Sequence, residues 1–152
     1  MGELRNRSQH IHLFPRILVV DDEPRVRRFL SHRFPHELFV VECAEDGAAA
    51  LDRIRNADPP IDAIVLDLSM PVMDGFEVLT EITKIDDSIP VVVLSARNAE
   101  EEKVRALDLG AAEYITKPFS VPVLARRLRW HLLRSTDPSM NASKTDERSK
   151  QE

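Results

Sequence analysis

The sequence contains a single cysteine and no long hydrophobic run. Cys43 is alone among 152 residues, so no disulfide can form within the chain. Because it follows the apolar run 38–41, we predict that its side chain is buried by packing. No apolar stretch approaches the ~20 residues that a membrane span requires, and residues 1–15 lack the apolar core of a secretory signal. These absences favour a cytoplasmic protein with no membrane partner.

Positive charge is also scarce. Lys and Arg total 21 residues against 26 Asp and Glu, which gives a formal net charge of −5. This balance argues against a dedicated nucleic-acid binder, although charge alone does not exclude one. Hydrophobic residues make up 43% and charged residues 31%, proportions typical of a globular protein.

The two ends of the chain differ from its middle. Residues 135–152 are rich in Ser, Lys, Asp and Glu without apolar periodicity, which predicts a disordered tail or the start of a linker. Residues 1–15 are predicted to form a flexible extension. The folded domain is therefore expected to span residues 16–134.

Short β-type runs alternate with helical segments through this domain. The strand candidates are Ile17–Val20, Leu38–Glu42, Ile61–Leu66, Val91–Leu94 and Glu113–Ile115. Three of them are continuous and β-branched, as in strands covered on both faces of a parallel sheet. The fourth of the five helical segments is expected to begin with Asn98 and Glu101 in a capping-box pattern and to end at Gly110 in the C′ position. Strict alternation predicts a doubly wound α/β sandwich with right-handed crossovers.

Polar residues follow the ends of four of these strands. They are Asp21, Asp22, Asp67, Ser95 and Lys117. In an open α/β sheet the carboxyl ends of the strands are where ligands bind. Each residue alone has an ordinary structural explanation, such as a helix-start cluster for the acidic pair. Their joint placement favours a common site.

These residue types suit one kind of chemistry. Three carboxylates in one pocket repel one another unless a cation neutralises them, and hard oxygen ligands suit Mg²⁺, with Mn²⁺ as an alternative. A carboxylate beside such a metal can act as a nucleophile and form an aspartyl phosphate. Lys117 would then supply the cation, and Ser95 the hydroxyl, that phosphoryl transfer needs.

Three stretches carry a family resemblance. Ile17–Pro24, Asp67–Leu79 and Gly110–Phe119 resemble the receiver domains of two-component response regulators, the CheY-like superfamily, and the match extends over residues 16–134. The resemblance implies a flavodoxin-like, doubly wound five-stranded parallel sheet in the order 2-1-3-4-5 with five helices. It also implies a signalling switch rather than an enzyme, one that is phosphorylated by a histidine kinase or phosphotransfer protein.

The same resemblance implies roles for single residues. Asp67 becomes the phosphoacceptor and binds Mg²⁺ directly together with Asp22 and the backbone carbonyl of Ser69, while Asp21 holds the metal through water. Autodephosphorylation would be the only other self-catalysed step.

Further residues are expected around the phosphate. Ser95 and the amide of Ala96 bind phosphoryl oxygens, Lys117 pairs with another, and Tyr114 is the aromatic switch residue that moves with Ser95. The resemblance also predicts a cis peptide between Lys117 and Pro118.

The last predicted helix is basic. Arginines surround Trp130, which is compatible with nucleic acid, with a merely basic polar face, or with a protein partner. In the receivers that this chain resembles, the fourth helix, fifth strand and fifth helix form a dimer or target surface, and we favour that use. Members of that charged face include Asp108, Glu113, Arg127 and Arg134. Val123 differs from the pattern, because an acidic residue would be expected at its position.

Two other functions would use part of the same residue set. A metal-dependent phosphohydrolase with an aspartyl-phosphate intermediate would need a second Asp two residues after Asp67, where Ser69 stands. A degenerate receiver that only binds partners would lack one of the residues named above, and none is missing.

Overall fold

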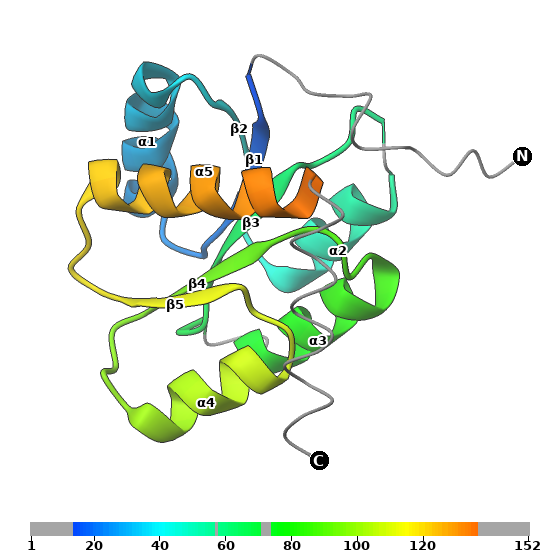
Figure 1. The fold of residues 1–152 in the computed structure, drawn as a ribbon, viewed down its shortest axis with the longest axis vertical. Helices are drawn as coiled ribbons and strands as arrows, with labels where there is room; N and C mark the ends of the chain where they lie inside the picture. Colours follow the sequence, from blue (N-terminus) through cyan, green and yellow to red (C-terminus); the bar gives the residue numbers. More distant parts are fainter. Residues whose placement is uncertain (1–13, 57, 71–73, 137–152) are drawn as a thin grey trace, which may run out of the picture.

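The computed structural model describes residues 14–56, 58–70 and 74–136. Within these residues the chain forms one parallel sheet in the order β2-β1-β3-β4-β5, flanked by helices on both faces (Figure 1). The strands are β1 (Arg16–Val20), β2 (Val40–Ala44), β3 (Ala63–Asp67), β4 (Val91–Ser95) and β5 (Glu113–Thr116). The helices are α1 (Pro24–Arg33), the short 3₁₀ helix η2 (Phe34–Glu37), α2 (Gly47–Arg55), α3 (Gly75–Ile85), α4 (Glu100–Asp108) and α5 (Val121–Thr136). The predicted fold class and strand order are confirmed.

Alternation along the strands divides the core into two layers. In β1, Ile17 and Val19 pack with Leu30 of α1 and Leu124 of α5, whereas Leu18 and its alternate neighbours face α2, α3 and α4. Successive side chains of a strand point to opposite faces, so a strand covered on both sides must be apolar throughout. This burial fixes the register of the sheet and therefore which residues meet at its carboxyl edge.

Two helix ends follow from local hydrogen bonds. The Asp74 carboxylate accepts from the amide of Phe76 at 2.9 Å and begins α3. After α4, Gly110 has φ +111°, a conformation that side-chain-bearing residues rarely adopt. Its amide donates to the carbonyl of Leu107, and the amide of Ala111 donates to the carbonyl of Ala106. These two hydrogen bonds form a Schellman motif. Gly110 is therefore at C′, as predicted.

Several predicted boundaries were wrong. Strand β2 begins at Val40 rather than Leu38, because Leu38 has φ +65° and ends η2, a turn that the sequence did not predict. Strand β3 begins at Ala63 rather than Ile61. Helix α4 begins after Ala99 without a side-chain cap, so the capping box at Asn98 is absent.

Two further expectations concern burial and the ends of the domain. Cys43 is exposed, not buried, because β2 is an edge strand. Its sulfur lies 3.3 Å from the hydroxyl oxygen of Ser31 on α1. Helix α5 runs to Thr136, so Ser135 and Thr136 belong to it rather than to the predicted tail. Residues 1–13 of the predicted extension and 137–152 of the predicted tail lie outside the described residues. None of the helices in the described part has the length and apolar content needed to cross a bilayer.

Candidate functional site

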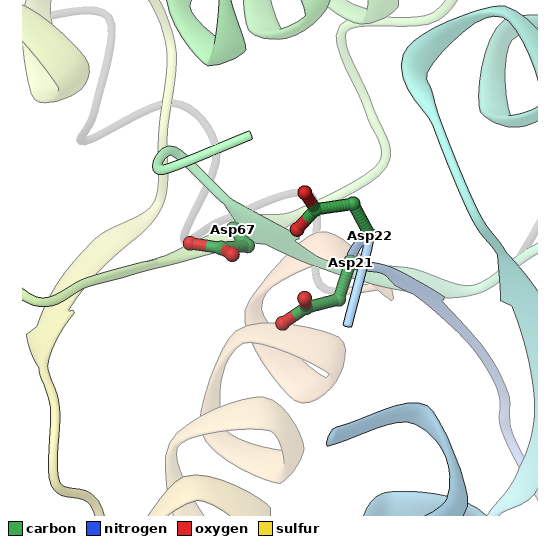
Figure 2. A group of neighbouring side chains, drawn as sticks. All are labelled: Asp21, Asp22 and Asp67. Carbon is green, nitrogen blue, oxygen red and sulfur yellow. The ribbon is translucent and has the colours of Figure 1, made fainter. Parts of the chain in front are cut away.

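Three carboxylates meet at the carboxyl edge of the sheet. Asp21 and Asp22 follow β1, and Asp67 is the last residue of β3, the strand that pairs with β1 (Figure 2). Each side chain offers an oxygen, and these oxygens lie within 4.8 Å of one another. Asp21 and Asp67 are 1% and 3% exposed, and Asp22 lies nearer the solvent. The parallel register, rather than proximity along the chain, brings Asp67 to the acidic pair.

The Asp21 carboxyl group accepts a hydrogen bond at one oxygen and none at the other. Oδ1 accepts from the amide of Glu23 at 2.9 Å, whereas Oδ2 is buried without a hydrogen bond. Burial, followed by the negative charges of Asp67 and Asp22, raises the pKa of Asp21 from 3.8 to about 6, although the Glu23 amide and Lys117 act in the opposite direction. The surroundings of Asp21 therefore disfavour its ionised form.

Lys117 supplies the cation of the site. Its Nζ lies 3.4 Å from Oδ2 of Asp67 and 3.8 Å from Oδ2 of Asp21. The peptide between Lys117 and Pro118 is cis, as predicted. The amide of Lys117 donates to the carbonyl of Ser95 at 2.7 Å, which ties the loop after β5 to the end of β4.

A hydrogen-bonded chain leads from the site to α4. The buried Ser95 hydroxyl accepts from the amide of Arg97 at 3.1 Å. The Tyr114 hydroxyl donates to the Arg97 carbonyl at 2.6 Å and lies 3.3 Å from Oε2 of Glu102. The Arg97 guanidinium in turn pairs with Glu102 at 3.2 Å. Ser95 and Tyr114, both predicted from sequence, are therefore linked through a residue whose side chain points to solvent.

The remaining predicted residues lie around these groups. Ser69 is exposed, and its amide donates to Oδ1 of Asp67 at 2.9 Å. Ala96 is exposed in the loop after β4. The structure thus brings together Asp21, Asp22, Asp67 and Lys117, with Ser95 at the end of the adjoining strand.

Sequence reasoning missed two contributors. Arg27 donates to the carbonyl of Asp21, and Glu102 contacts the Tyr114 hydroxyl. Both are half-buried charged residues on helices that carry several other charges, so no sequence signal set them apart.

The donor set suits a hard divalent cation. Three carboxylates within reach of one point, and a buried Asp21 oxygen that lacks any hydrogen bond, fit an ion that is bound through oxygen. Such an ion would also offset the repulsion between the carboxylates, which adds to burial in raising the pKa of Asp21.

Comparison with known proteins identifies the family. The sequence profile described as the response regulator receiver domain matches residues 17–129. The chain belongs to the response regulator receiver domain family. It is a receiver domain of two-component signalling, a switch rather than a conventional enzyme, and receiver domains generally use Mg²⁺ and act with a histidine kinase or phosphotransfer partner.

Relatives and solved structures agree on the family. Response regulator MprA from Mycobacterium sp. (strain KMS) is 46% identical over 123 residues, which are 81% of this chain and 52% of that protein. The receiver domain of Francisella response regulator 1452 shares 34% identity with a TM-score of 0.72, covering 80% of this chain and 98% of that one. CheY from Borrelia burgdorferi, solved with CheX, BeF₃ and Mg²⁺, shares 32% identity with a TM-score of 0.70, covering 75% and 86%. The receiver domain described here thus spans about half the length of the curated relatives it matches.

Proposed function

We propose that this receiver domain accepts a phosphoryl group on Asp67 in a Mg²⁺-dependent reaction, and that the modification changes the surface formed by α4, β5 and α5. The observation that carries the proposal is the packing of three carboxylates and Lys117 around one point at the edge of the sheet. The Borrelia CheY complex contains BeF₃ and Mg²⁺, which supports the same chemistry for this chain.

The reaction is a direct displacement at phosphorus. An oxygen of the Asp67 carboxylate attacks the phosphoryl group carried by a histidine of the donor, an O–P bond forms, and the P–N bond breaks with its electron pair passing to the imidazole. Mg²⁺, when bound, supplies positive charge to the phosphoryl oxygens. Asp67, Asp22 and the Ser69 carbonyl would hold it directly, and Asp21 through water. Water attack on the acyl phosphate later returns Asp67 and inorganic phosphate.

Other residues place the phosphoryl group. Lys117, already 3.4 Å from Asp67, would pair with one oxygen, while the Ser95 hydroxyl and the Ala96 amide would donate to others. The exposed Ala96 has a small side chain that leaves this approach open. A Ser95 hydroxyl drawn toward phosphate would alter its contact with Arg97 and hence the place of Tyr114.

The signal would leave through the α4–β5–α5 surface. Glu113 of β5 contacts Arg127 at 3.3 Å and His131 at 2.7 Å, so polar contacts within the chain already join β5 to α5 on this charged face. We infer that it binds a downstream protein or a second copy, without direct nucleic-acid contact. A cytoplasmic location belongs to the same proposal, as does a domain that begins at residue 16 and extends to the end of α5.

Acetyl phosphate tests the phosphoacceptor. With Mg²⁺ we expect intact mass to increase by one phosphoryl group and peptide mapping to place it on Asp67. Asp67→Asn should abolish labelling, whereas Asp52→Asn, which removes the same charge from an exposed position on α2, should not. Undiminished labelling of Asp67→Asn would refute the assignment.

A further inference from the structure

We propose that Arg27 is a positioning residue for the metal site and acts through the backbone carbonyl of Asp21. Its Nη1 donates to that carbonyl at 2.7 Å. The carbonyl belongs to the peptide that joins Asp21 to Asp22, so a guanidinium bound there fixes the plane from which both carboxylates project. This inference rests on the proposed function only in taking Mg²⁺ as the ion.

The Asp21 carbonyl needs such a partner because the sheet ends at this point. The amide of Asp21 still donates to Ala44 of β2 at 3.1 Å, but β2 ends there and α2 soon begins. A backbone carbonyl left without a donor in a partly buried place is unfavourable. Arg27, on the next helix, supplies the donor that a further residue of β2 would have supplied.

Three hydrogen bonds form a closed ring around the loop. The amide of Glu23 donates to Oδ1 of Asp21, the amide of Arg27 donates to the Glu23 carbonyl, and the Arg27 side chain returns to the Asp21 carbonyl. Cys43 of β2 also contacts the Arg27 carbonyl at 3.9 Å. The ring thus connects the first turn of α1 to the segment that carries two of the three carboxylates.

The contact is with the backbone, and this separates Arg27 from Lys117. Lys117 approaches the carboxylates themselves at 3.4 and 3.8 Å and so acts by charge. Arg27 acts by geometry: without it the Asp21–Asp22 peptide could rotate, and the two side chains would no longer share one binding point with Asp67. Partners that orient metal ligands typically change metal affinity 10–100-fold when removed.

The test measures the Mg²⁺ dissociation constant of the folded protein by titration of its amide resonances. Arg27→Met keeps an unbranched apolar stem without a donor, and Arg27→Gln keeps an amide donor that stops short of the carbonyl. We expect either variant to bind Mg²⁺ about tenfold more weakly than wild type. Arg27→Lys should remain within about threefold, because only one nitrogen is used.

Arg28→Met is the matched control. Arg28 is the next residue on α1, is exposed, and carries the same charge, and its substitution should leave affinity within about twofold. If Arg27→Met and Arg27→Gln bind Mg²⁺ as tightly as Arg28→Met, the inference is overturned. Weak binding of Mg²⁺ by wild type, together with no labelling of Asp67, would instead refute the proposed function. If Arg27→Met does not fold, the Mg²⁺ dissociation constant of Arg27→Gln is compared with that of Arg28→Met instead.

Discussion

At the scale of single residues, burial of the Asp21 carboxyl group opposes folding. Its pKa is raised to about 6 in the folded protein, against 3.8 ordinarily, so the folded state binds more protons than the unfolded state between these values. The free energy of unfolding is therefore highest, as far as this group is concerned, below pH 3.8, and it falls as the pH rises to about 6. The loss corresponds to roughly 2–3 kcal/mol.

Asp21→Asn should remove this penalty. The amide oxygen of Asn can still accept from the Glu23 amide. We expect the variant, without metal, to be more stable than wild type by on the order of 2 kcal/mol at pH 7.5 and nearly equal to it at pH 4. Urea melts at both pH values in EDTA make the comparison. Parallel pH profiles for the two proteins would contradict the assignment of the raised pKa.

The Tyr114 hydroxyl gives a second measurement at this scale. Burial raises the pKa of Tyr114, and the neighbouring carboxylate of Glu102 raises it further. Glu102→Gln should therefore lower that pKa, because a tyrosinate no longer faces a negative charge.

Absorbance near 295 nm follows the titration directly, since Tyr114 is the only tyrosine in the chain. Glu101→Gln, on the same helix and exposed, is the control. An unchanged pKa in Glu102→Gln would mean that the hydrogen-bonded chain from Ser95 to α4 does not persist in solution.

At the scale of elements, α3 lies so close to the loop after β3 that only glycine fits at its start. A Cβ on Gly75 would lie 2.7 Å from the Cα of Leu68, which is backbone and cannot turn aside. This approach places the first turn of α3 against Leu68, the residue that follows Asp67 at the end of β3. Asp74, the residue before Gly75, is the N-cap of this helix.

Gly75→Ala should destabilise the protein. Alanine improves helix propensity by at most about 1 kcal/mol, whereas overpacking typically costs 1–3 kcal/mol, and a backbone contact is the least able to relax. We expect a net loss of about 1–2 kcal/mol in a urea melt. Glu77→Ala, exposed on the same helix, should change stability by less than about 0.5 kcal/mol. A Gly75→Ala variant as stable as wild type would show that α3 moves away without penalty.

At the scale of the whole molecule, metal binding and folding should be linked through the acidic cluster. Asp67→Asn removes one of three neighbouring charges with little change in volume. Its lost ion pair with Lys117 offsets part of the relief, yet we expect a higher unfolding midpoint than wild type in EDTA, by roughly 1 kcal/mol. Excess Mg²⁺ should stabilise wild type more than the variant, because the ion binds only the folded site.

Urea melts of both proteins with EDTA and with Mg²⁺ test this linkage. Asp62→Asn is a poor control because Asp62 accepts from the Arg16 amide at 2.7 Å, so the exposed Asp52→Asn serves instead. Equal midpoints in EDTA, with no gain from metal in wild type, would mean that the three carboxylates do not form a common site.

Sequence alone determined the alternation of strands and helices and the residues at the strand ends. Runs such as 91–94 must be buried on both faces, so a parallel sheet follows, and its carboxyl edge must collect Asp21, Asp67 and Lys117. The Gly110 helix end was also predictable, because that backbone conformation excludes most residues.

Only the tertiary structure decided the partners of the charged helical residues. The contacts of Arg27 with the Asp21 carbonyl, of Glu102 with Tyr114, and of Arg127 with Glu113 join different elements. The exposure of Cys43 likewise depends on β2 being an edge strand. Apolar periodicity reports which face of an element is buried, but a charged side chain finds its partner only after the elements have packed. That step sets the distances within the site.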